Sequence, residues 1–199
     1  PQAGRRGKQR RLEERGAVPF GRPGGATGRR AVIDWFVEHK RAQLLQDGSK
    51  SPFDSPTIRN LYDVLAGDEA KFEIDQLTVD VGLVAMGMTV FEGKTAYLVN
   101  MVHAGAEYAR CSPGALLLHR MVAQAHKRGA RTYDFGPGVL SYKLEWEPEV
   151  VPLLATTFLV KPSGLHVHAA YVFGVLAKAK IKRSVQLSRM ARAIRRWIA

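Results

Sequence analysis

The sequence predicts an α/β (α+β) fold in which a mixed central sheet is flanked by helices and a basic helix follows at the C-terminal end. Three β-prone segments follow one another in the middle of the chain, at residues 72–81, 83–91 and 94–103. Apolar residues recur at helical spacing both before and after this run. The 199 residues, 46% of them hydrophobic, suffice for a hydrophobic core and argue against a disordered or fibrous chain.

The first elements of the chain are charged or rich in glycine. Residues 8–15 predict a short helix that ends at Gly16, and residues 17–20 predict a brief strand. Residues 21–28 contain four glycines and one proline, a composition typical of a loop. These elements precede the part of the chain in which regular apolar spacing begins.

Two longer helices are expected before the sheet. Residues 30–46 keep apolar side chains at helical spacing, and Gly48 marks the end of this helix. Ser55 and Pro56 suit the N-cap and the first position of a second helix, which runs to about Leu65.

The second half of the chain completes the sheet and ends in a helix. Glu92-Gly93 joins the last two β-prone segments and is typical of a tight hairpin turn. The remaining elements are a helix at 113–128, a strand at 131–135, a glycine-rich turn at 136–138, a strand at 150–160 and a basic helix at about 167–198.

Basic residues are concentrated at the two ends of the chain. Residues 1–30 contain nine Lys and Arg with two acidic residues, and residues 178–199 contain eight with no acidic residue. Residues 31–177 carry 13 basic and 16 acidic residues, so this body is mildly acidic although the whole chain is +12. A domain whose main face binds nucleic acid has a different charge profile, so nucleic acid is the less favoured partner.

Several kinds of site and segment are not expected. The single cysteine excludes a disulfide framework and a Cys-rich zinc module. No apolar run is long enough for a transmembrane helix, and no apolar stretch follows the basic start as in a signal peptide. His166 and His168 would share one face of a strand, but no further ligands stand at metal spacing. We therefore expect no metal and a cytoplasmic location.

Residues 108–119 follow a strand and open a helix. Ser112 is a favourable N-cap, Pro113 suits the first helical position, and Gly114 permits another group to approach the backbone closely. A helix N-terminus with Arg110 beside it favours an anion such as a pyrophosphate. Plain capping of a strand-to-helix turn explains the same residues, and both interpretations stay open.

Residues 133–146 leave a strand through a turn that needs glycine dihedral angles. Asp134, Tyr142 and Lys143 then fall close together at the end of that strand. A tyrosine hydroxyl there can donate a proton to a leaving group, and a lysine can stabilise a developing negative charge. In the structural alternative Asp134 caps the turn, Tyr142 packs and Lys143 is solvated.

Together these motifs resemble those of the CelD-type acyltransferase family, a group of GNAT-like proteins associated with bacterial cellulose or exopolysaccharide synthesis. The motifs are Arg-Cys-Ser-Pro-Gly at 110–114 before a Leu-rich helix, Tyr-Asp-Phe-Gly-Pro-Gly at 133–138, and Tyr-Lys-Leu-Glu-Trp at 142–146. The resemblance extends over about residues 8–160, and the order of elements also matches the GNAT pattern.

The resemblance implies that acetyl-CoA or another acyl-CoA binds as co-substrate where two central strands splay apart. It places the pyrophosphate at the start of the helix at 113–128 and the pantetheine arm along the backbone near residues 101–103. The cofactor-binding residues that it implies are Met101, Val102, Arg110, Cys111, Ser112, Pro113, Gly114 and Ala115.

The resemblance also implies direct acyl transfer to an amine or hydroxyl. Tyr142 is our candidate for the acid that protonates the departing thiolate, with Lys143 beside it. His103 and Asp134 are the first candidates for the general base, ahead of Glu107. Cys111 has no Asp or His relay in the sequence, so a thiol nucleophile is not favoured.

Some features depart from the family pattern. The usual GNAT pyrophosphate loop is richer in glycine, and Pro113 removes one amide donor, so fewer phosphate contacts are expected. The segment at 142–146 also resembles FemA/FemB-like transferases, which use charged tRNA, and this is the alternative enzyme class. A non-catalytic GNAT-fold interaction module is the third hypothesis.

The chain divides into three predicted parts. Residues 1–30 form a basic extension with the first helix and strand, residues 31–165 form the acyltransferase domain, and residues 166–199 form a basic amphipathic helix. The amphipathic helix suits an anionic membrane surface or an acidic protein partner. A helix packed on its own domain is the equal alternative. The acceptor is expected to be a small molecule or saccharide.

Overall fold

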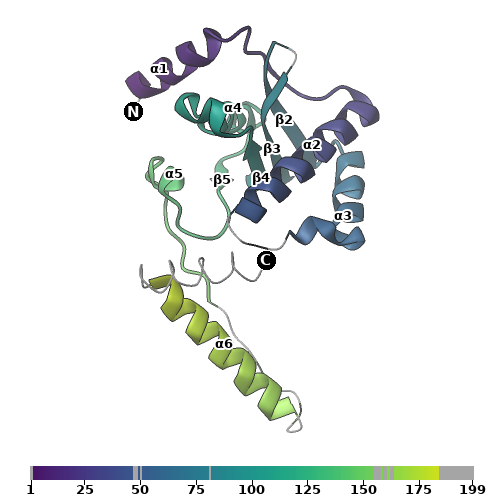
Figure 1. The fold of residues 1–199 in the computed structure, drawn as a ribbon, viewed down its shortest axis with the longest axis vertical. Coiled ribbons are helices and arrows are strands. Elements are labelled where there is room, and N and C mark those ends of the chain that lie inside the picture. The colour runs from purple at the N-terminus through teal and green to yellow at the C-terminus, as the bar shows by residue number, and fades with distance from the viewer. Residues whose placement is uncertain are drawn as a thin grey trace. The chain divides into compact units, whose positions relative to one another are not determined.

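The computed structural model describes residues 2–46, 49, 51–80, 82–154, 158, 161 and 164–183, and its centre is one five-stranded sheet (Figure 1). The strands, in spatial and chain order, are β1 (Phe20–Gly21), β2 (Phe72–Val79), β3 (Gly82–Glu92), β4 (Thr95–His103) and β5 (Thr132–Asp134). The first four pair antiparallel, whereas β5 pairs parallel to β4. The predicted mixed sheet is confirmed.

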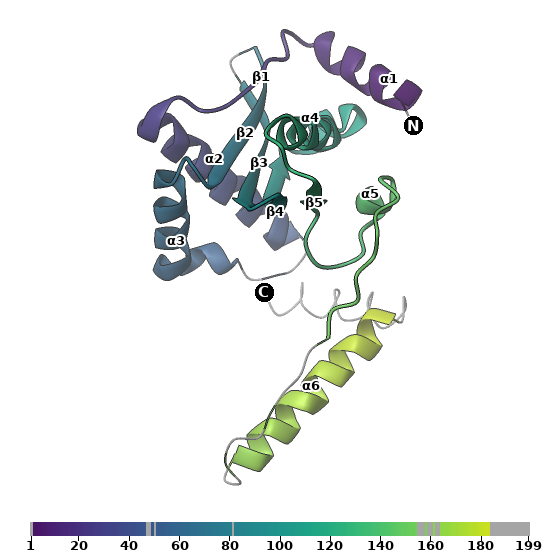
Figure 2. The same cartoon turned by 180° about the vertical axis from the view of Figure 1, so that it is seen from behind.

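Helices cover both faces of this sheet. The helices are α1 (Gln2–Glu13), α2 (Gly25–Gln46), α3 (Pro56–Gly67), α4 (Pro113–Lys127), α5 (Ser141–Leu144) and α6 (Leu165–Arg183), with short 3-10 helices η1 (Pro52–Asp54) and η2 (Ala106–Cys111). Figures 1 and 2 show α2 and α3 on one face of the sheet and α4 on the other. The chain forms two compact units, residues 1–43 with 51–147 and residues 44–50 with 148–199, and the sheet belongs to the first.

Each face of the sheet has its own apolar core. On the α2–α3 face, the ring centroids of Phe36, Phe53 and Tyr62 lie 5.2–5.5 Å apart. On the α4 face, Gly87 permits close approach of the helix, because a Cβ there would lie 2.5 Å from the Met121 sulfur. The α4-face core comprises Leu12, Leu77, Val79, Val84, Ala85, Ala104, Cys111, Leu116, Leu117 and Met121.

The three predicted central strands and the hairpin between the last two are confirmed. Gly93 in the β3–β4 turn has a φ of +57°, a left-handed conformation that glycine adopts without steric cost. The predicted strand at 131–135 is β5, and the predicted helix at 113–128 is α4.

The N-terminal elements differ in their bounds from the predictions. The strand predicted at 17–20 forms only at its end, as β1, because Pro19 has no N–H to donate, although its carbonyl oxygen accepts the Thr78 N–H at 3.2 Å. The loop predicted at 21–28 is wrong in its second half, where α2 has already begun. Arg29 is buried there and donates to the Phe72 carbonyl oxygen at 2.9 Å, which anchors this glycine-rich turn of helix.

The C-terminal predictions are corrected in part. Residues 150–154 contain no strand, and Pro152 interrupts that run; residues 155–157, 159 and 160 lie outside the described residues, as does Gly48. His166 and His168 lie on helix α6, where a spacing of two does not place them on one face, so the strand interpretation is wrong. Residues 184–199 of the predicted basic helix also lie outside the described part. Within that part no helix has the length and apolarity to span a membrane.

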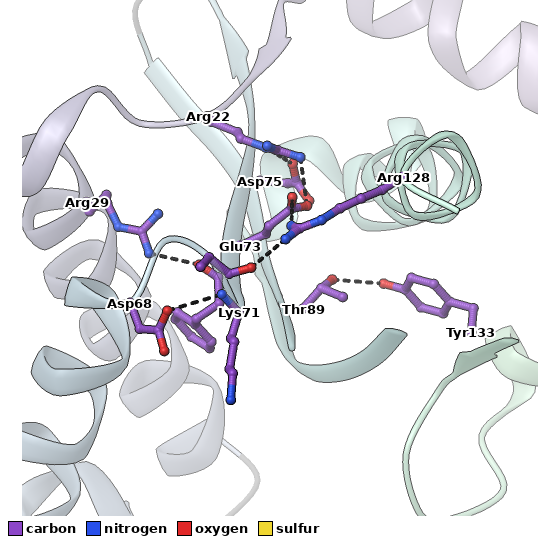
Figure 3. Close-up of polar contacts among 11 residues, drawn as sticks. Arg22, Arg29, Asp68, Lys71, Glu73, Asp75, Thr89, Arg128 and Tyr133 are labelled. Atoms are coloured by element: carbon purple, nitrogen blue, oxygen red, sulfur yellow. Dashed lines mark hydrogen bonds and ion pairs between the residues drawn. The ribbon is translucent and has the colours of Figure 1, made fainter. Parts of the chain in front are cut away.

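Strand β2 carries two buried carboxylates, Glu73 and Asp75, which pair with the partly exposed Arg22 and Arg128; these four residues are here called the β2 charge cluster (Figure 3). Arg22, in the loop after β1, places its Nη2 2.7 Å from Glu73 Oε2 and its Nε 3.5 Å from Asp75 Oδ1. Arg128, at the end of α4, donates to Glu73 Oε1. The cluster therefore ties the N-terminal segment and α4 to the middle of the sheet.

Candidate functional site

Strands β4 and β5 pair over only a short length before they part. Their parallel pairing runs from Thr95 opposite Thr132 to Tyr97 opposite Asp134. Gly136 is still close to β4, since a Cβ there would lie 3.5 Å from the Leu98 carbonyl oxygen. Beyond this point residues 99–103 of β4, here called the open edge, have no strand beside them on the β5 side in the described structure. The two central strands therefore splay apart as the resemblance implies.

The hydrogen-bond pattern of β4 shows which backbone groups the open edge presents. The Ala104 N–H donates to the Val84 carbonyl oxygen at 2.7 Å, in register with the β3–β4 ladder. In an antiparallel pair, residues alternate between bonding to the partner and facing away from it. Val102 therefore bonds to β3, while the N–H and C=O groups of Met101 and His103 face the open side. The outward-facing backbone groups of the open edge therefore belong to Met101 and His103, and those of Val102 are used by β3.

A β-bulge marks the beginning of the open edge. Asn100 lies opposite Met88 and Leu98 lies opposite Thr89, so Val99 has no partner on β3. A bulge of this kind bends its strand and increases the local twist. Here it stands where β4 separates from β5.

Residues 106–115 connect the open edge to α4. Ser112 occupies the predicted N-cap position, but in a left-handed conformation with φ 47°, and its side chain makes no capping hydrogen bond, so that part of the prediction is wrong. Ala115 and Leu116 both donate to the Ser112 carbonyl oxygen, at 3.0 and 3.2 Å. Pro113 has no N–H. Gly114 therefore provides the first amide N–H of the helix, and no backbone carbonyl oxygen in the described chain accepts a hydrogen bond from it.

The predicted phosphate-binding residues divide by exposure. Arg110 is exposed beside the start of α4, whereas Cys111 is 3% exposed and its thiol belongs to the core. A Cβ on Gly114 would lie 3.2 Å from Cδ2 of His103, so glycine permits the His103 ring to rest against the helix. The end of β4 and the start of α4 are thereby held together.

His103 has the geometry of a proton acceptor. Its Nδ1 lies 2.9 Å from the Ala104 carbonyl oxygen, which can only accept, so Nδ1 carries the proton of the neutral ring. The Nε2 lone pair of this exposed side chain is then available.

Asp134 and Lys143 both stabilise the glycine-rich turn. Asp134 Oδ1 accepts the Gly136 N–H at 2.6 Å, which is the capping role of the structural alternative. The Lys143 ammonium is buried and donates to the carbonyl oxygens of Gly136, Pro137 and Gly138 at 2.9, 3.0 and 3.2 Å. Its three protons are thus used within the turn, and the solvated alternative for Lys143 is wrong. A direct chemical role for either residue stays a prediction.

Tyr142 lies next to Lys143 on α5, partly buried. Burial raises the pKa of the Tyr142 hydroxyl above its ordinary value, so the hydroxyl keeps its proton at neutral pH. Trp146, just after α5, packs against His119 of α4 with ring centroids 4.2 Å apart and ring planes tilted by 35°, which holds this segment against the helix. The nearby Tyr133 hydroxyl has its pKa raised to about 12 by burial, lies 3.2 Å from Thr89 Oγ1, and is therefore also neutral.

Sequence reasoning missed Asn100 and Tyr62 at the open edge. The Asn100 side chain accepts the Met101 N–H through Oδ1 at 3.1 Å and donates through Nδ2 to the Tyr62 hydroxyl at 3.3 Å. The only signal in the sequence was an amide side chain inside a β-prone segment. In the described part of the chain no group of acidic, histidine or cysteine side chains could hold a metal ion.

Comparisons with known proteins agree with this geometry. The model of the "Acetyltransferase (GNAT) domain" matches residues 3–144. An aminoglycoside acetyltransferase from an uncultured soil metagenomic sample, solved in complex with sisomicin, is 12% identical with a TM-score of 0.52, over 75% of this chain and 99% of that chain. A possible acetyltransferase from Clostridium difficile 630 is 13% identical with a TM-score of 0.54, over 73% and 97%.

A transcriptional regulator from Bacillus halodurans C-125 is similar to the same extent, at 11% identity and a TM-score of 0.53, over 72% of this chain and 100% of that chain. No curated protein sequence matches the chain. At these identities the structural likenesses establish the fold alone, whereas the domain model spans well over half of the 199 residues. The chain belongs to the GNAT acetyltransferase family.

Proposed function

We propose that this chain transfers an acyl group, in the first instance acetyl, from acyl-CoA to an amine or hydroxyl acceptor. The observation that carries the proposal is the open edge of β4, which ends against the N-terminus of α4 at His103 and Gly114. An extended amide-containing arm can pair with the edge while an anionic group lies at the helix. Acyl-CoA combines both features.

The donor is proposed to bind in two parts. Met101 and His103 offer backbone N–H and C=O groups to the pantetheine arm, and the unpaired Gly114 amide with the exposed Arg110 receives the pyrophosphate. Pro113 reduces the number of amide donors, so phosphate binding relies more on Arg110 than in a glycine-rich loop. Among the other predicted contact residues, the Cys111 thiol lies in the core and the Ala115 N–H already donates to the Ser112 carbonyl oxygen, so these two are proposed to shape the loop and not to bind phosphate directly.

The chemistry is proposed to be direct transfer between acyl-CoA and the acceptor. The attacking amine or hydroxyl loses its proton to a general base, and its oxygen or nitrogen forms a bond to the thioester carbonyl carbon as the carbon–sulfur bond breaks. His103 and Asp134 stay the candidates for this base; the His103 ring lies against Gly114, at the pyrophosphate end of the proposed site, so His103 would receive the proton through intervening water. The neutral Tyr142 hydroxyl then protonates the departing thiolate. Asp134 and Lys143 position this acid by holding the turn before α5.

A role in surface-polysaccharide synthesis, as in the CelD-type family, is the proposed biological setting, with a saccharide or other small molecule as acceptor. A peripheral membrane position or an acidic protein partner for the basic C-terminal helix belongs to the same proposal. The aminoacyl transfer from charged tRNA and the non-catalytic module remain the competing hypotheses, and binding assays separate them.

Isothermal titration with acetyl-CoA and with tRNA tests the proposal. Wild-type protein is expected to bind acetyl-CoA, and Arg110→Ala is expected to weaken binding about 10-fold through loss of a charged phosphate contact. Arg59→Ala is the matched control, because Arg59 is exposed on α3, on the opposite face of the sheet, and its loss is expected to change nothing.

Three results would contradict the proposal. Absence of acetyl-CoA binding by the wild-type protein removes the acyl-CoA donor. Tight tRNA binding that falls steeply with salt favours aminoacyl transfer or a nucleic-acid module. Equal losses in Arg110→Ala and Arg59→Ala would show a general charge effect and no phosphate site at Arg110.

A further inference from the structure

We infer that Asn100 is a positioning residue that occupies the donor-binding edge of β4 until acyl-CoA displaces it. The inference rests on the proposed function, because it concerns the same open edge. It assigns roles to Asn100 and Tyr62 that the sequence did not suggest. The Asn100 bridge is defined as the pair of hydrogen bonds from Met101 N–H to Asn100 Oδ1 and from Asn100 Nδ2 to the Tyr62 hydroxyl.

The Met101 N–H points away from β3. The alternation set by the Ala104–Val84 hydrogen bond turns this group away from β3, toward the side on which β5 has departed. An incoming pantetheine carbonyl would approach this N–H. In the structure, the Asn100 side-chain oxygen is already there at 3.1 Å.

The Asn100 side-chain oxygen and a pantetheine carbonyl oxygen cannot both accept a hydrogen bond from the Met101 N–H at the same time. An oxygen at hydrogen-bond distance from the N–H excludes another acceptor from the same position. A backbone ligand at the open edge must therefore break the bond from Met101 to Asn100 before it pairs. The cost of breaking that bond lowers the affinity for the donor.

The Asn100 carboxamide has a second hydrogen bond, which holds it in place when the donor binds. Its Nδ2 is held by the hydroxyl of Tyr62, which is 8% exposed and packs against Phe36 and Phe53 on the α2–α3 face of the sheet. When the donor takes the Met101 N–H, the carboxamide keeps this second bond and its oxygen becomes free. A hydrogen-bond acceptor is then presented beside the donor only after the donor has bound.

The experiment measures the affinity of two ligands for a series of variants. Coenzyme A engages both the open edge and the α4 N-terminus, whereas adenosine 3′,5′-bisphosphate lacks the pantetheine arm and cannot reach the edge. Calorimetric affinities are compared for wild-type protein, Asn100→Ala, Asn100→Asp and Tyr62→Phe. Asn60→Ala is the matched control, an exposed amide on the same helix as Tyr62.

The inference predicts a signed order of coenzyme A affinities. Asn100→Ala frees the N–H and is expected to bind roughly 3- to 10-fold more tightly, the equivalent of one net hydrogen bond. Tyr62→Phe loosens the Asn100 bridge and is expected to bind about 2-fold more tightly. Asn100→Asp accepts the N–H with a charged oxygen and is expected to bind about 3-fold less tightly. Affinity for the bisphosphate is expected to change in none of them.

Loss of structure would lower the affinity for both ligands, so it cannot imitate the predicted gain. If Asn100→Ala and Tyr62→Phe bind coenzyme A no more tightly than wild-type protein, the inference is wrong while the proposed donor site stands. If no form of the protein binds coenzyme A, both are wrong. In the wild-type protein the NMR signals of the Asn100 carboxamide must also shift on addition of coenzyme A and not of the bisphosphate; their constancy would overturn the inference.

Discussion

The β2 charge cluster and the open edge of β4 are two polar regions of one sheet, and they are satisfied in opposite ways. In the cluster, each buried carboxylate has an arginine brought to it from another element. At the open edge, backbone groups of Met101 and His103 are turned toward a side on which the described chain supplies no strand. The charges of the cluster are paired across elements and tie the fold together, whereas the outward-facing backbone groups of the open edge pair with no strand in the described part of the chain, and the Met101 N–H bonds only to the neighbouring Asn100 side chain.

Lys143 shows why proximity to a site is insufficient to assign a chemical role. It lies beside the candidate acid Tyr142, yet its ammonium donates to three carbonyl oxygens of the turn. All three ammonium protons of Lys143 are used in hydrogen bonds within the protein, so this group resembles the paired charges of the β2 charge cluster more than the open edge. Its contribution to acyl transfer is therefore expected to pass through the position of Tyr142.

The largest effect is expected from breaking the β2 charge cluster at Glu73. Glu73→Ala removes the carboxylate shared by Arg22 and Arg128, both of which are brought to the strand by it. Glu73 is buried, but the Arg22 and Arg128 side chains are 50% and 36% exposed, so solvent screens both pairs and the removal is expected to lower the free energy of unfolding by about 2–3 kcal/mol. Urea denaturation at pH 7.5 measures this loss.

The control for Glu73→Ala is an ion pair at the surface. Asp63→Ala breaks a 3.0 Å pair with Arg30, whose side chains are 39% and 65% exposed. Exposed pairs contribute between 0 and about 1 kcal/mol. Equal losses of stability in the two variants would show that the cluster on β2 has no special structural weight.

The next effect concerns the chemistry at the open side. Tyr142→Phe is expected to lower turnover about 100-fold, because the thiolate then leaves without a positioned acid. The affinity for acetyl-CoA is expected to stay unchanged, since the ring remains in place. Steady-state kinetics together with calorimetry separate the two quantities. Unchanged turnover would show that Tyr142 is not the acid and that the thiolate takes its proton from solvent.

A smaller effect is expected from Asp75, the member of the β2 charge cluster whose buried carboxylate has an oxygen without a hydrogen bond to the described residues. Burial raises the pKa of its carboxyl from 3.8 to about 6 against the opposing attraction of Arg22, and its Oδ1 has no hydrogen-bond partner in the described structure. The folded state therefore holds this proton more tightly than the unfolded chain. Its stabilising contribution is complete below about pH 4 and is lost as the pH rises through about 6.

Asp75→Asn is expected to remove this loss. The amide stays neutral, and Arg22 keeps its contact with Glu73, so the variant is expected to gain on the order of 2 kcal/mol over wild-type protein at pH 7.5 and about a third of that at pH 4.5. Urea denaturation at both pH values gives the difference. A gain that is the same at the two pH values would contradict the raised pKa as its cause.

Much of the fold was predictable because it depends on local patterns. The three central strands, the Gly93 turn and α4 follow from apolar spacing and from residues with special backbone requirements. The order of these elements also matched the GNAT pattern, and the domain match confirms the GNAT family, whereas membership of the CelD-type group stays a prediction. The start of α2 was missed because Arg29 stabilises it through the Phe72 carbonyl, a contact between distant parts of the chain.

The candidate site was predictable only in outline. The segments around Ser112 and Tyr142 were recognised from their motifs, but the sequence could not show that Lys143 is consumed by its own turn. Nor could it show which residues of β4 face the open side. That depends on the ladder register and on the bulge at Val99, which no short motif encodes. Asn100 was overlooked for the same reason.

The smallest effect separates the two contributions that Ser112 can make at the open site. Ser112 holds a left-handed φ of 47° without a side-chain capping bond, so its hydroxyl is available to a ligand and its backbone is strained. Ser112→Gly relieves the strain but also adds freedom to the unfolded chain, and these terms nearly cancel, to within about 0.5 kcal/mol of stability. Ser112→Ala removes the hydroxyl and keeps the strain.

If the hydroxyl binds phosphate, both variants lose about the same few-fold affinity for coenzyme A in calorimetry, because neither has an oxygen to offer. If only the left-handed turn matters, Ser112→Gly binds as wild-type protein does, and the open site depends on its backbone alone.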